Sequence, residues 1–338
     1  MEQCFFSGSN SGEGFFNQFD GVIPPWVALK RYFMIKGGPG VGKSTLMKRV
    51  AQRAEEKGEE VERFYCSGDP DSLDAVRLVG REIVLADATA PHCMDPNLPG
   101  AVEEIVNLGE QIDRTRIVKY RDEIEELISK NKKSYRRAYA FLGAAKNLEA
   151  ERYHEIAACV DREKIIKCGK ELSDVAENKE DRRERRLFLD AISCKGRISF
   201  LPRMIKENEV YCVTGRYKDV ITDLLSKSIP SDRKEVFCSP LRPQCVNHMR
   251  LKERAILLTS GDSADGRKFI SEEFLKKVPD KSTDVFFPEA RHMEEEAMKC
   301  LAECKQIHDE LEDIYRECVD FERITGRTEE LMEFIDTL

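Results

Sequence analysis

Short apolar runs and longer segments with apolar residues at helical spacing succeed one another along the chain. Residues 32–36 and Ile83–Asp87 are runs that predict buried strands. Residues 44–54 follow the first run and carry apolar side chains three or four positions apart, at Leu46, Met47, Val50, Ala51 and Ala54. This spacing predicts a helix with one buried face. Strands and amphipathic helices in succession are typical of an α/β protein.

A charge-rich region from about residue 111 to residue 186 has a different pattern. Its apolar residues recur at helical spacing, at Ile124, Leu127, Ile128, Tyr135, Ala138, Tyr139 and Leu142. A similar stripe near the C-terminus comprises Leu311, Ile314, Tyr315 and Cys318. We expect the stripes to pack against each other or against their own sheets; a groove for a cofactor or partner is the alternative. The sequence thus predicts a helical insertion at about 111–186, inside a first half of residues 1–186.

The segment between the first strand and its helix reads Gly-Gly-Pro-Gly-Val-Gly-Lys-Ser. Its glycines let backbone N–H groups converge on phosphate oxygens, and the start of the following helix adds a positive partial charge. Lys43 is placed to reach the β- and γ-phosphates, and the Ser44 hydroxyl to ligate Mg²⁺. An ordinary glycine-rich turn explains the glycines but not a lysine followed by a serine. We predict a nucleotide site formed by Gly37, Gly38, Pro39, Gly40, Val41, Gly42, Lys43, Ser44 and Thr45.

A phosphate loop of this kind needs a carboxylate at the end of a neighbouring strand, where it holds the water shell of Mg²⁺. Asp87 ends an apolar run and is assigned this role, with a simple turn residue as the alternative. His92 follows it closely, where an imidazole could position water or sense the terminal phosphate. A loop histidine without catalytic duty explains His92 equally well. The candidate catalytic residues are Lys43, Asp87 and His92, and the candidate metal ligands are Ser44 and Asp87.

The second half of the chain, residues 187–338, repeats local spacings of the first half. The matched positions are Phe6 with Phe188, Gly14 with Gly196, Cys66 with Cys238 and Asp87 with Thr259. A further match relates residues 122–126 to residues 309–313. Because these matches keep their order, the sequence predicts a duplicated unit. The predicted fold is α/β, with a P-loop NTPase-type parallel sheet, helices on both faces and helical insertions in each copy.

Residues 215–222 take the place of the phosphate loop in this register. Its last glycine is replaced by Val220, its lysine by Ile221 and the strand-end aspartate by Thr259. Lys218 lies nearby, at a different offset. Loss of the lysine and of the carboxylate removes the main partners of the triphosphate and of Mg²⁺. The sequence therefore predicts one bound nucleotide per chain, with the second half as a packing or regulatory partner.

The composition narrows the function classes. The chain has 338 residues, 35% of them charged, and a net charge of −8, which argues against a general nucleic-acid-binding surface. No apolar stretch approaches the ~18 residues needed to span a bilayer and the N-terminus has no export signal, so we expect a cytoplasmic protein. The 12 cysteines include no Cys-x-x-Cys pair and are predicted to be reduced thiols. Cys300, Cys304 and His308 share one helix face, but three ligands from one segment fall short of the four typical of structural zinc.

The residues also carry a resemblance to a known family. Residues 37–48, 66–74 and 308–315, together with the Asp-Ala-Thr-Ala-Pro-His stretch that begins at Asp87, resemble a poorly characterised bacterial family of tandem P-loop ATPase-like proteins. The resemblance spans nearly the whole chain and implies a P-loop fold and ATP binding. In that family the second half generally resembles another phosphate loop, and this chain departs from the pattern there.

Three functions follow as alternatives. The first is an ATP-binding protein with weak or partner-stimulated ATPase activity, because Ala88 stands where many motor ATPases carry a water-polarising glutamate. The second is a small-molecule kinase in which the helical insertion closes over the site and Arg136 or Arg137 steadies the phosphate. The third is a nucleotide-sensing scaffold without turnover. Residues 178–181 read Asn-Lys-Glu-Asp but lack the apolar strand that precedes a guanine-specific motif, so ATP is favoured over GTP.

Overall fold

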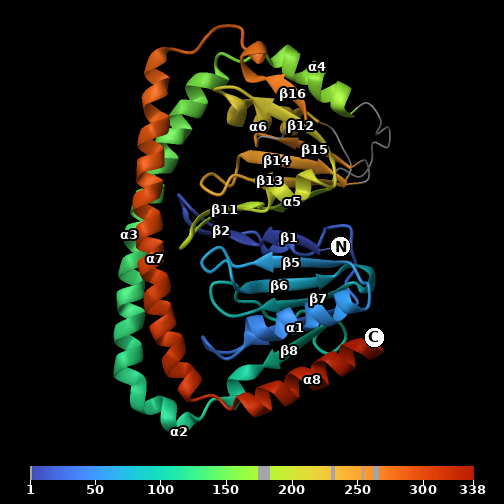
Figure 1. Ribbon diagram of the computed structural model, residues 1–338, viewed down its shortest axis with the longest axis vertical. Coiled ribbons are helices and arrows are strands. Elements are labelled where there is room, and N and C mark those ends of the chain that lie inside the picture. The colour runs from blue at the N-terminus through green and yellow to red at the C-terminus, as the bar shows by residue number, and fades with distance from the viewer. Residues whose placement is uncertain (1, 174–182, 230–232, 253–254, 262–265) are drawn as a thin grey trace.

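The computed structural model describes residues 2–173, 183–229, 233–252, 255–261 and 266–338, which form a mixed α/β protein with two six-stranded sheets (Figure 1). The first sheet has the order β1 (Glu2–Phe6), β5 (Val61–Tyr65), β6 (Leu73–Leu78), β7 (Ile83–Asp87), β4 (Arg31–Lys36), β8 (Glu103–Asn107). The second has the order β9 (Glu184–Leu187), β13 (Lys234–Cys238), β14 (Val246–Leu251), β15 (Ile256–Thr259), β12 (Glu209–Thr214), β16 (Arg267–Ile270). We call the chain through residue 173 the first half and the chain from β9 onward the second half.

The expectation of purely parallel sheets is wrong for one strand in each sheet. Strand β6 runs antiparallel to both β5 and β7, and β14 runs antiparallel to both β13 and β15. The connection from β5 to β6 contains no helix, since only residues 66–72 lie between them. Such a short connection returns the chain beside the strand that it has just left, which makes the pair antiparallel.

The two sheets place corresponding strands at corresponding positions. Each half also has a two-stranded hairpin after its first strand: β2 (Gly8–Ser11) with β3 (Gly14–Asn17), and β10 (Asp190–Ser193) with β11 (Gly196–Ser199). Both turns close in the same way, because Ser11 Oγ donates to Gly14 O at 2.8 Å and Ser193 Oγ donates to Gly196 O at 2.8 Å. Phe6 and Phe188, which match in the sequence, exchange backbone hydrogen bonds of 2.9 and 3.2 Å where the halves meet.

One face of each sheet is covered by helices. Helices α1 (Lys43–Glu56) and α8 (Phe321–Thr337) share a hydrophobic cluster with the first sheet, and α6 (Lys218–Ser228) and α4 (Arg162–Ser173) share one with the second. The opposite faces contribute to a common cluster that includes Phe5, Phe64, Phe237 and Leu257 from strands of both sheets. The short helix α5 (Leu201–Ile205) adds Leu201 and Met204 to that cluster. The halves are therefore joined by a shared hydrophobic core.

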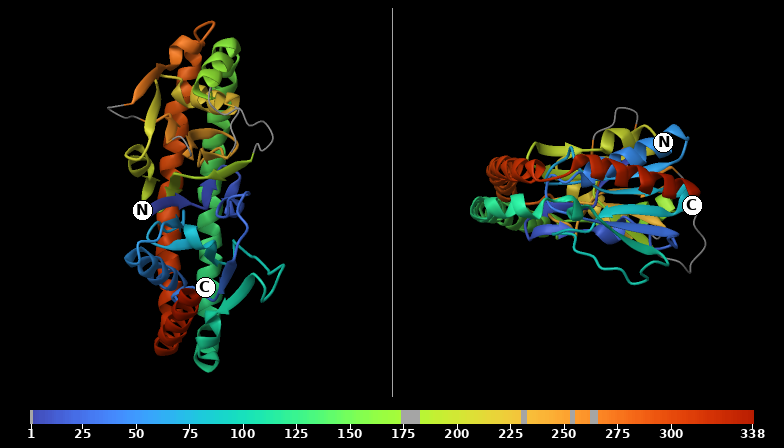
Figure 2. Two further views of the ribbon diagram at one scale, coloured as in Figure 1. Left: turned by 90° about the vertical axis from the view of Figure 1, so that its right-hand side faces the viewer. Right: turned by 90° about the horizontal axis from the view of Figure 1, so that it is seen from below.

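Two long helices exchange segments between the halves. After the short α2 (Arg114–Ile117), α3 (Arg121–Ala157) leads from the first half to α4, which packs on the second sheet. Helix α7 (Phe286–Glu317) leads from the second half to α8, which packs on the first sheet. The two long helices lie side by side along the molecule (Figures 1 and 2). Their apolar stripes meet, as expected, with Ile124 and Leu127 of α3 against Leu311 and Ile314 of α7.

Two expectations about this helical region are wrong. The region is helical up to Ser173, but Glu184–Leu187 is strand β9, where hydrogen bonding to β13 replaces the helix expected up to about residue 186. The match of residues 122–126 to residues 309–313 does not reflect equivalent positions. The first segment lies at the start of α3 and the second lies near the end of α7, and the two helix ends are in contact.

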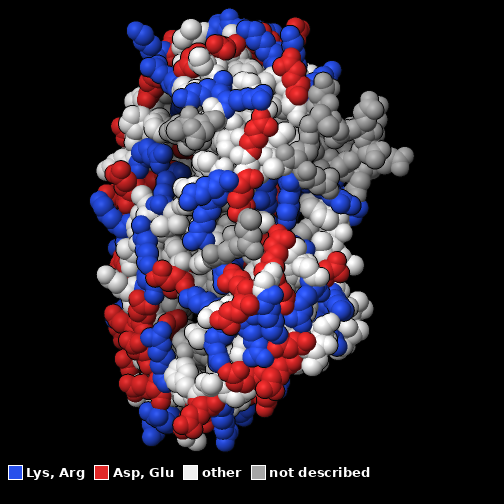
Figure 3. Space-filling view, turned by 45° about the vertical axis from the view of Figure 1, so that its right-hand side comes forward, with Lys and Arg blue, Asp and Glu red and all other residues white. Residues whose placement is uncertain are grey.

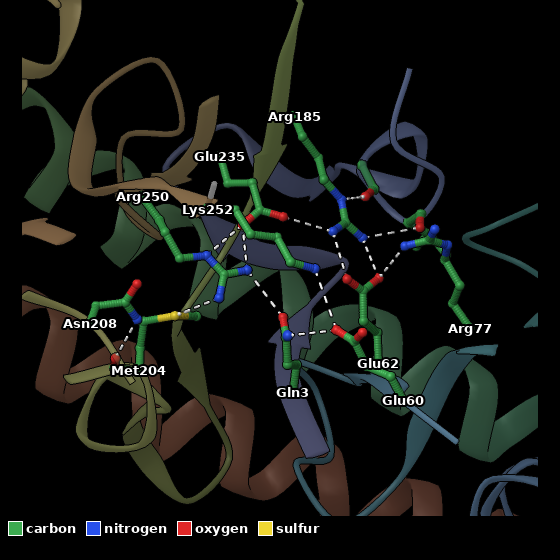
Figure 4. A network of polar contacts seen from close by, with 12 residues as sticks. Gln3, Glu60, Glu62, Arg77, Arg185, Met204, Asn208, Glu235, Arg250 and Lys252 are labelled. Atoms are coloured by element: carbon green, nitrogen blue, oxygen red, sulfur yellow. Dashed lines mark hydrogen bonds and ion pairs between the residues drawn. The ribbon is translucent and has the colours of Figure 1, made fainter. Parts of the chain in front are cut away.

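A buried network of charged residues lies between the sheets (Figure 4). Arg185 of β9 is 1% exposed and donates to Glu62 of β5 at 2.7 Å and to Glu235 of β13 at 3.0 Å. Arg77 pairs with Glu62, and Arg250 pairs with Glu235, so each half contributes a cross-strand Arg–Glu pair. The Arg185 side chain also contacts the rings of Phe5 and Phe64 in the shared core. Arg185 therefore connects the charge pairs of the two halves.

On the face that Figure 3 shows, Lys and Arg are interspersed with Asp and Glu. Among the described residues, none of the helices has the length and apolar character needed to cross a lipid bilayer.

Candidate functional site

The phosphate-binding loop predicted from the sequence connects β4 to α1. Gly40 and Gly42 adopt φ values of +68° and +93°, a left-handed conformation that favours glycine. Gly42 is the N-cap of α1 and offers no side chain to the first N–H groups of the helix. The positive end of α1 therefore faces the loop without a side-chain cap, as an anion-binding helix start requires.

Lys43 and Asp87 lie together at the end of the first sheet. Lys43 Nζ is 3.6 Å from Asp87 Oδ2 and donates to the backbone oxygens of Gly37 at 3.1 Å and Gly38 at 2.9 Å. Both side chains are largely shielded from solvent, with exposures of 13% and 18%. The proximity arises because β7, which ends at Asp87, pairs directly with β4. The structure thus brings together the lysine and the carboxylate that the sequence singled out.

The two predicted metal ligands, Ser44 and Asp87, each offer an oxygen atom at this site. Ser44 Oγ accepts a hydrogen bond from Leu73 N at 2.9 Å, which fixes the hydroxyl and leaves it able to coordinate a cation. Asp87 Oδ1 accepts from Thr89 N at 2.9 Å. Hydroxyl and carboxylate oxygens are the ligands that Mg²⁺ prefers, so this donor set fits the ion. Thr45 is exposed on the first turn of α1.

His92 lies in different surroundings from those expected. Its side chain is buried, its Nε2 atom is 3.4 Å from Asp74 Oδ2, and its ring centroid is 4.5 Å from that of Phe19. Its Nδ1 atom is buried without a hydrogen-bond partner in the structure. These contacts are with Asp74 and aromatic rings rather than with Lys43 or Asp87. A catalytic role for His92 stays a prediction that no described contact supports.

The loop that precedes β6 contains two aspartates, Asp69 and Asp71. Asp69 Oδ2 is 3.6 Å from Lys305 Nζ of α7, and Asp71 pairs with Lys195 of the second half. The loop is therefore tied to the second half by two ion pairs.

The end of α7 covers the phosphate loop, which the sequence did not reveal. A Cβ atom at Gly38 would lie 2.8 Å from Tyr315 Cε1, and one at Gly40 would lie 2.9 Å from Glu312 O and 3.2 Å from Arg316 Cγ. Gly40 therefore needs glycine for a second reason besides its positive φ, and Gly38 needs it because the Tyr315 ring approaches closely. Tyr315 belonged to an apolar stripe in the sequence, but nothing in its spacing indicated a contact with the loop.

The corresponding loop of the second half is shorter. It comprises residues 215–217 between β12 and α6, whereas residues 37–42 separate β4 from α1. Lys218 is the first residue of α6, as Lys43 is the first residue of α1. The expected alignment of Lys43 with Ile221 therefore does not hold at the helix start. Ile221 is fully buried in the core of the second half.

The Glu272 carboxylate and the Ser271 hydroxyl each accept a hydrogen bond from an N–H group of this shorter loop. Arg216 N donates to Glu272 Oε1 at 2.9 Å, and Tyr217 N donates to Ser271 Oγ at 3.2 Å. Burial raises the pKa of Glu272, but the hydrogen bonds from Arg216 N–H and Ser271 outweigh it and lower the pKa overall. In the first half, the equivalent helical turn after β8 carries Gly109 next to the loop. The sequence had given no indication of this contact.

The strand position of Asp87 is occupied by Thr259 in the second half. Thr259 Oγ1 lies 2.6 Å from His248 Nδ1 and accepts from Gly261 N at 2.8 Å. His248 Nε2 is 2.9 Å from Asp190 Oδ2. The threonine hydroxyl is thus engaged within the protein at the position where the first half presents a carboxylate.

Two further candidates from the sequence are the group of Cys300, Cys304 and His308 and the segment at 178–181. Burial raises the pKa of the Cys304 thiol to about 12, and His308 Nε2 lies 3.4 Å from Glu312 Oε1. Within the described ranges, no group of three or more His, Cys, Asp or Glu side chains is arranged to hold a metal ion. The Asn-Lys-Glu-Asp segment at 178–181 lies outside the described residues.

Comparison with known proteins gives one similarity. Residues 25–164 match the model of a protein family described as Nephrocystin 3, N-terminal. The matched region contains the phosphate loop, Asp87 and α3, and does not reach the second half. Neither the curated proteins nor the solved structures contain a match to the chain.

Proposed function

We propose that the first half binds ATP with Mg²⁺ and hydrolyses it slowly or on stimulation by a protein partner. The observation that carries the proposal is the position of Lys43, at the start of α1, 3.6 Å from Asp87 and within the glycine loop. The N–H groups of the loop and the lysine provide the positive charge that a triphosphate requires. ATP is preferred over GTP because the guanine-type motif lacks its strand in the sequence.

Magnesium belongs to the same proposal. Ser44 and Asp87 would hold the ion, which supplies charge neutralisation between the β- and γ-phosphates. The ammonium of Lys43 would bind the phosphate oxygens, and the α1 dipole would favour the bound negative charge. Ala88, which follows Asp87, is buried and offers no group to activate water. Hydrolysis without a partner is therefore expected to be slow.

We infer that the chain is a duplicated P-loop protein with one active site, in line with its resemblance to tandem P-loop ATPase-like proteins. The matching strand orders and hairpins support the duplication. The hydrogen bond from Arg216 N–H to the Glu272 carboxylate and the presence of Thr259 in the place of Asp87 support the loss of the second site. A carboxylate at this N–H group repels phosphate and competes with it for the same donor.

A single-turnover experiment with γ-labelled ATP, Mg²⁺ and a cell metabolite extract tests the reaction. Free labelled phosphate that accumulates slowly is the expected result, because Ala88 offers no group to activate water. A labelled small molecule would instead make the protein a kinase. Tight binding without any release of label would make it a non-hydrolysing nucleotide sensor. In either of these cases the proposed hydrolysis would be wrong while the binding site would stand.

A further inference from the structure

The end of α7 places an arginine beside the phosphate loop. Gly40 approaches Arg316 so closely that a Cβ atom there would lie 3.2 Å from Arg316 Cγ. On the same helix, Tyr315 packs on Gly38, and its neighbour along the chain, Arg316, projects beside the loop. Because α7 comes from the second half, this cation reaches the site from a part of the chain that carries no phosphate loop of its own.

Among the described residues, the guanidinium of Arg316 contacts Glu312 and Asp313, both on its own helix. It donates to Glu312 Oε2 at 2.7 Å and to Asp313 Oδ1 at 3.2 Å, and the Arg316 side chain is 53% exposed. Exposed pairs three or four residues apart on a helix contribute little to stability, and rotation of the side chain breaks them. A triphosphate carries several negative charges and accepts bidentate hydrogen bonds from guanidinium. Such a ligand can therefore compete for Arg316.

Two other cations, Arg137 and Lys305, are paired elsewhere. Arg137, suggested by the sequence, pairs with Glu303 of α7. Lys305 pairs with Asp309 and lies 3.6 Å from Asp69. Lys43 follows the glycine loop as the first residue of α1. Arg316 approaches from the opposite element, so it complements Lys43 rather than duplicating it.

We propose that Arg316 binds the terminal phosphate of the nucleotide held by the first half, so that α7 reports to the second half whether a triphosphate or a diphosphate is bound. This inference rests on the proposed ATP site. The physical basis is that the terminal phosphate distinguishes ATP from ADP and lies at the loop residues that α7 covers. When Arg316 exchanges its contact with Glu312 for one with the phosphate, the side-chain contacts in the last turns of α7 change. Because α7 is continuous with the second half, the change is passed to that half.

The test compares the affinities of ATP and ADP, both with Mg²⁺, in titrations of the full chain. Arg316→Ala is expected to raise the Kd of ATP about tenfold and to leave the Kd of ADP within about twofold, because ADP lacks the phosphate that Arg316 binds. Arg316→Lys keeps the charge but loses the bidentate geometry, so its Kd for ATP should lie between those of the wild type and Arg316→Ala. A structural role alone would shift both nucleotides equally.

Arg327→Ala is a matched control, because Arg327 is also 53% exposed and also pairs with a glutamate three residues away, on α8. It should change neither affinity. Equal losses for ATP and ADP in Arg316→Ala, or no loss for either, would overturn the role of Arg316 while ATP binding itself stood. A wild-type protein that binds neither nucleotide would overturn the proposed site and Arg316 together.

Discussion

Lys43→Ala is expected to raise the Kd of ATP about 100-fold, the cost of losing charge-assisted hydrogen bonds to the phosphates. Lys43 is largely buried next to Asp87, so its removal also leaves the carboxylate without its cation at the place where the triphosphate binds. That carboxylate then repels the phosphates directly. Isothermal titration with ATP and Mg²⁺ measures the effect, and the loss of ATP-induced thermal stabilisation provides a second readout.

Lys133→Ala is the control for that prediction, because Lys133 is exposed on α3 and its substitution removes the same charge from the protein. It should bind ATP as the wild type does. Full ATP affinity in Lys43→Ala would show that the glycine loop does not bind phosphate, and the assignment of the site would fall.

Arg185→Ala is expected to lower the free energy of unfolding by about 3–5 kcal/mol, the usual cost of breaking a buried ion pair from one side. The substitution leaves Glu62 and Glu235 buried between the two sheets with fewer partners. It also removes a side chain that packs on Phe5 and Phe64. Chemical denaturation at neutral pH measures the change.

The pH dependence gives that prediction a second test. Burial raises the pKa of Glu62, but Arg185 and Arg77 outweigh it and lower the pKa to about 2. Since the pKa is lower in the folded state, the stabilisation is present above about pH 4.5 and is lost as the pH falls towards 2. This loss should be smaller in Arg185→Ala.

Arg121→Ala removes an exposed arginine that pairs with Glu125 at the start of α3, and it serves as the matched control. It should leave the denaturation midpoint unchanged. An Arg185→Ala protein that is as stable as Arg121→Ala would show that the network does not hold the halves together.

The sequence predicted the local parts of the site because local residues form them. The glycine loop lies between a strand and a helix whose apolar patterns are continuous in the chain, and Asp87 ends a run that had to be a buried strand. The proximity of Lys43 to Asp87 followed from the pairing of these two strands. The sequence also predicted that Phe6 and Phe188 are equivalent, because hairpins of equal spacing follow both.

The parts that the sequence did not predict depend on contacts between distant segments. The sequence placed Arg185 at the end of the helical insertion, because its partners Glu62 and Glu235 come from other strands. Glu272 belongs to no sequence motif, and its contact with the loop at residues 215–217 depends on the pairing of β16 with β12. The approach of α7 to the loop depends on where a long helix ends after crossing the molecule. Periodicity predicts that such a helix exists but not which residues its last turn meets.

The stoichiometry of bound nucleotide tests the central claim most directly. Purified protein is titrated with ATP and Mg²⁺, and the nucleotide that remains after gel filtration is released and counted against protein concentration. The account predicts one equivalent of ATP per chain, lost in Lys43→Ala. Two equivalents of tightly bound ATP per chain would contradict it, because the loop that Glu272 occupies would then have to bind phosphate as well.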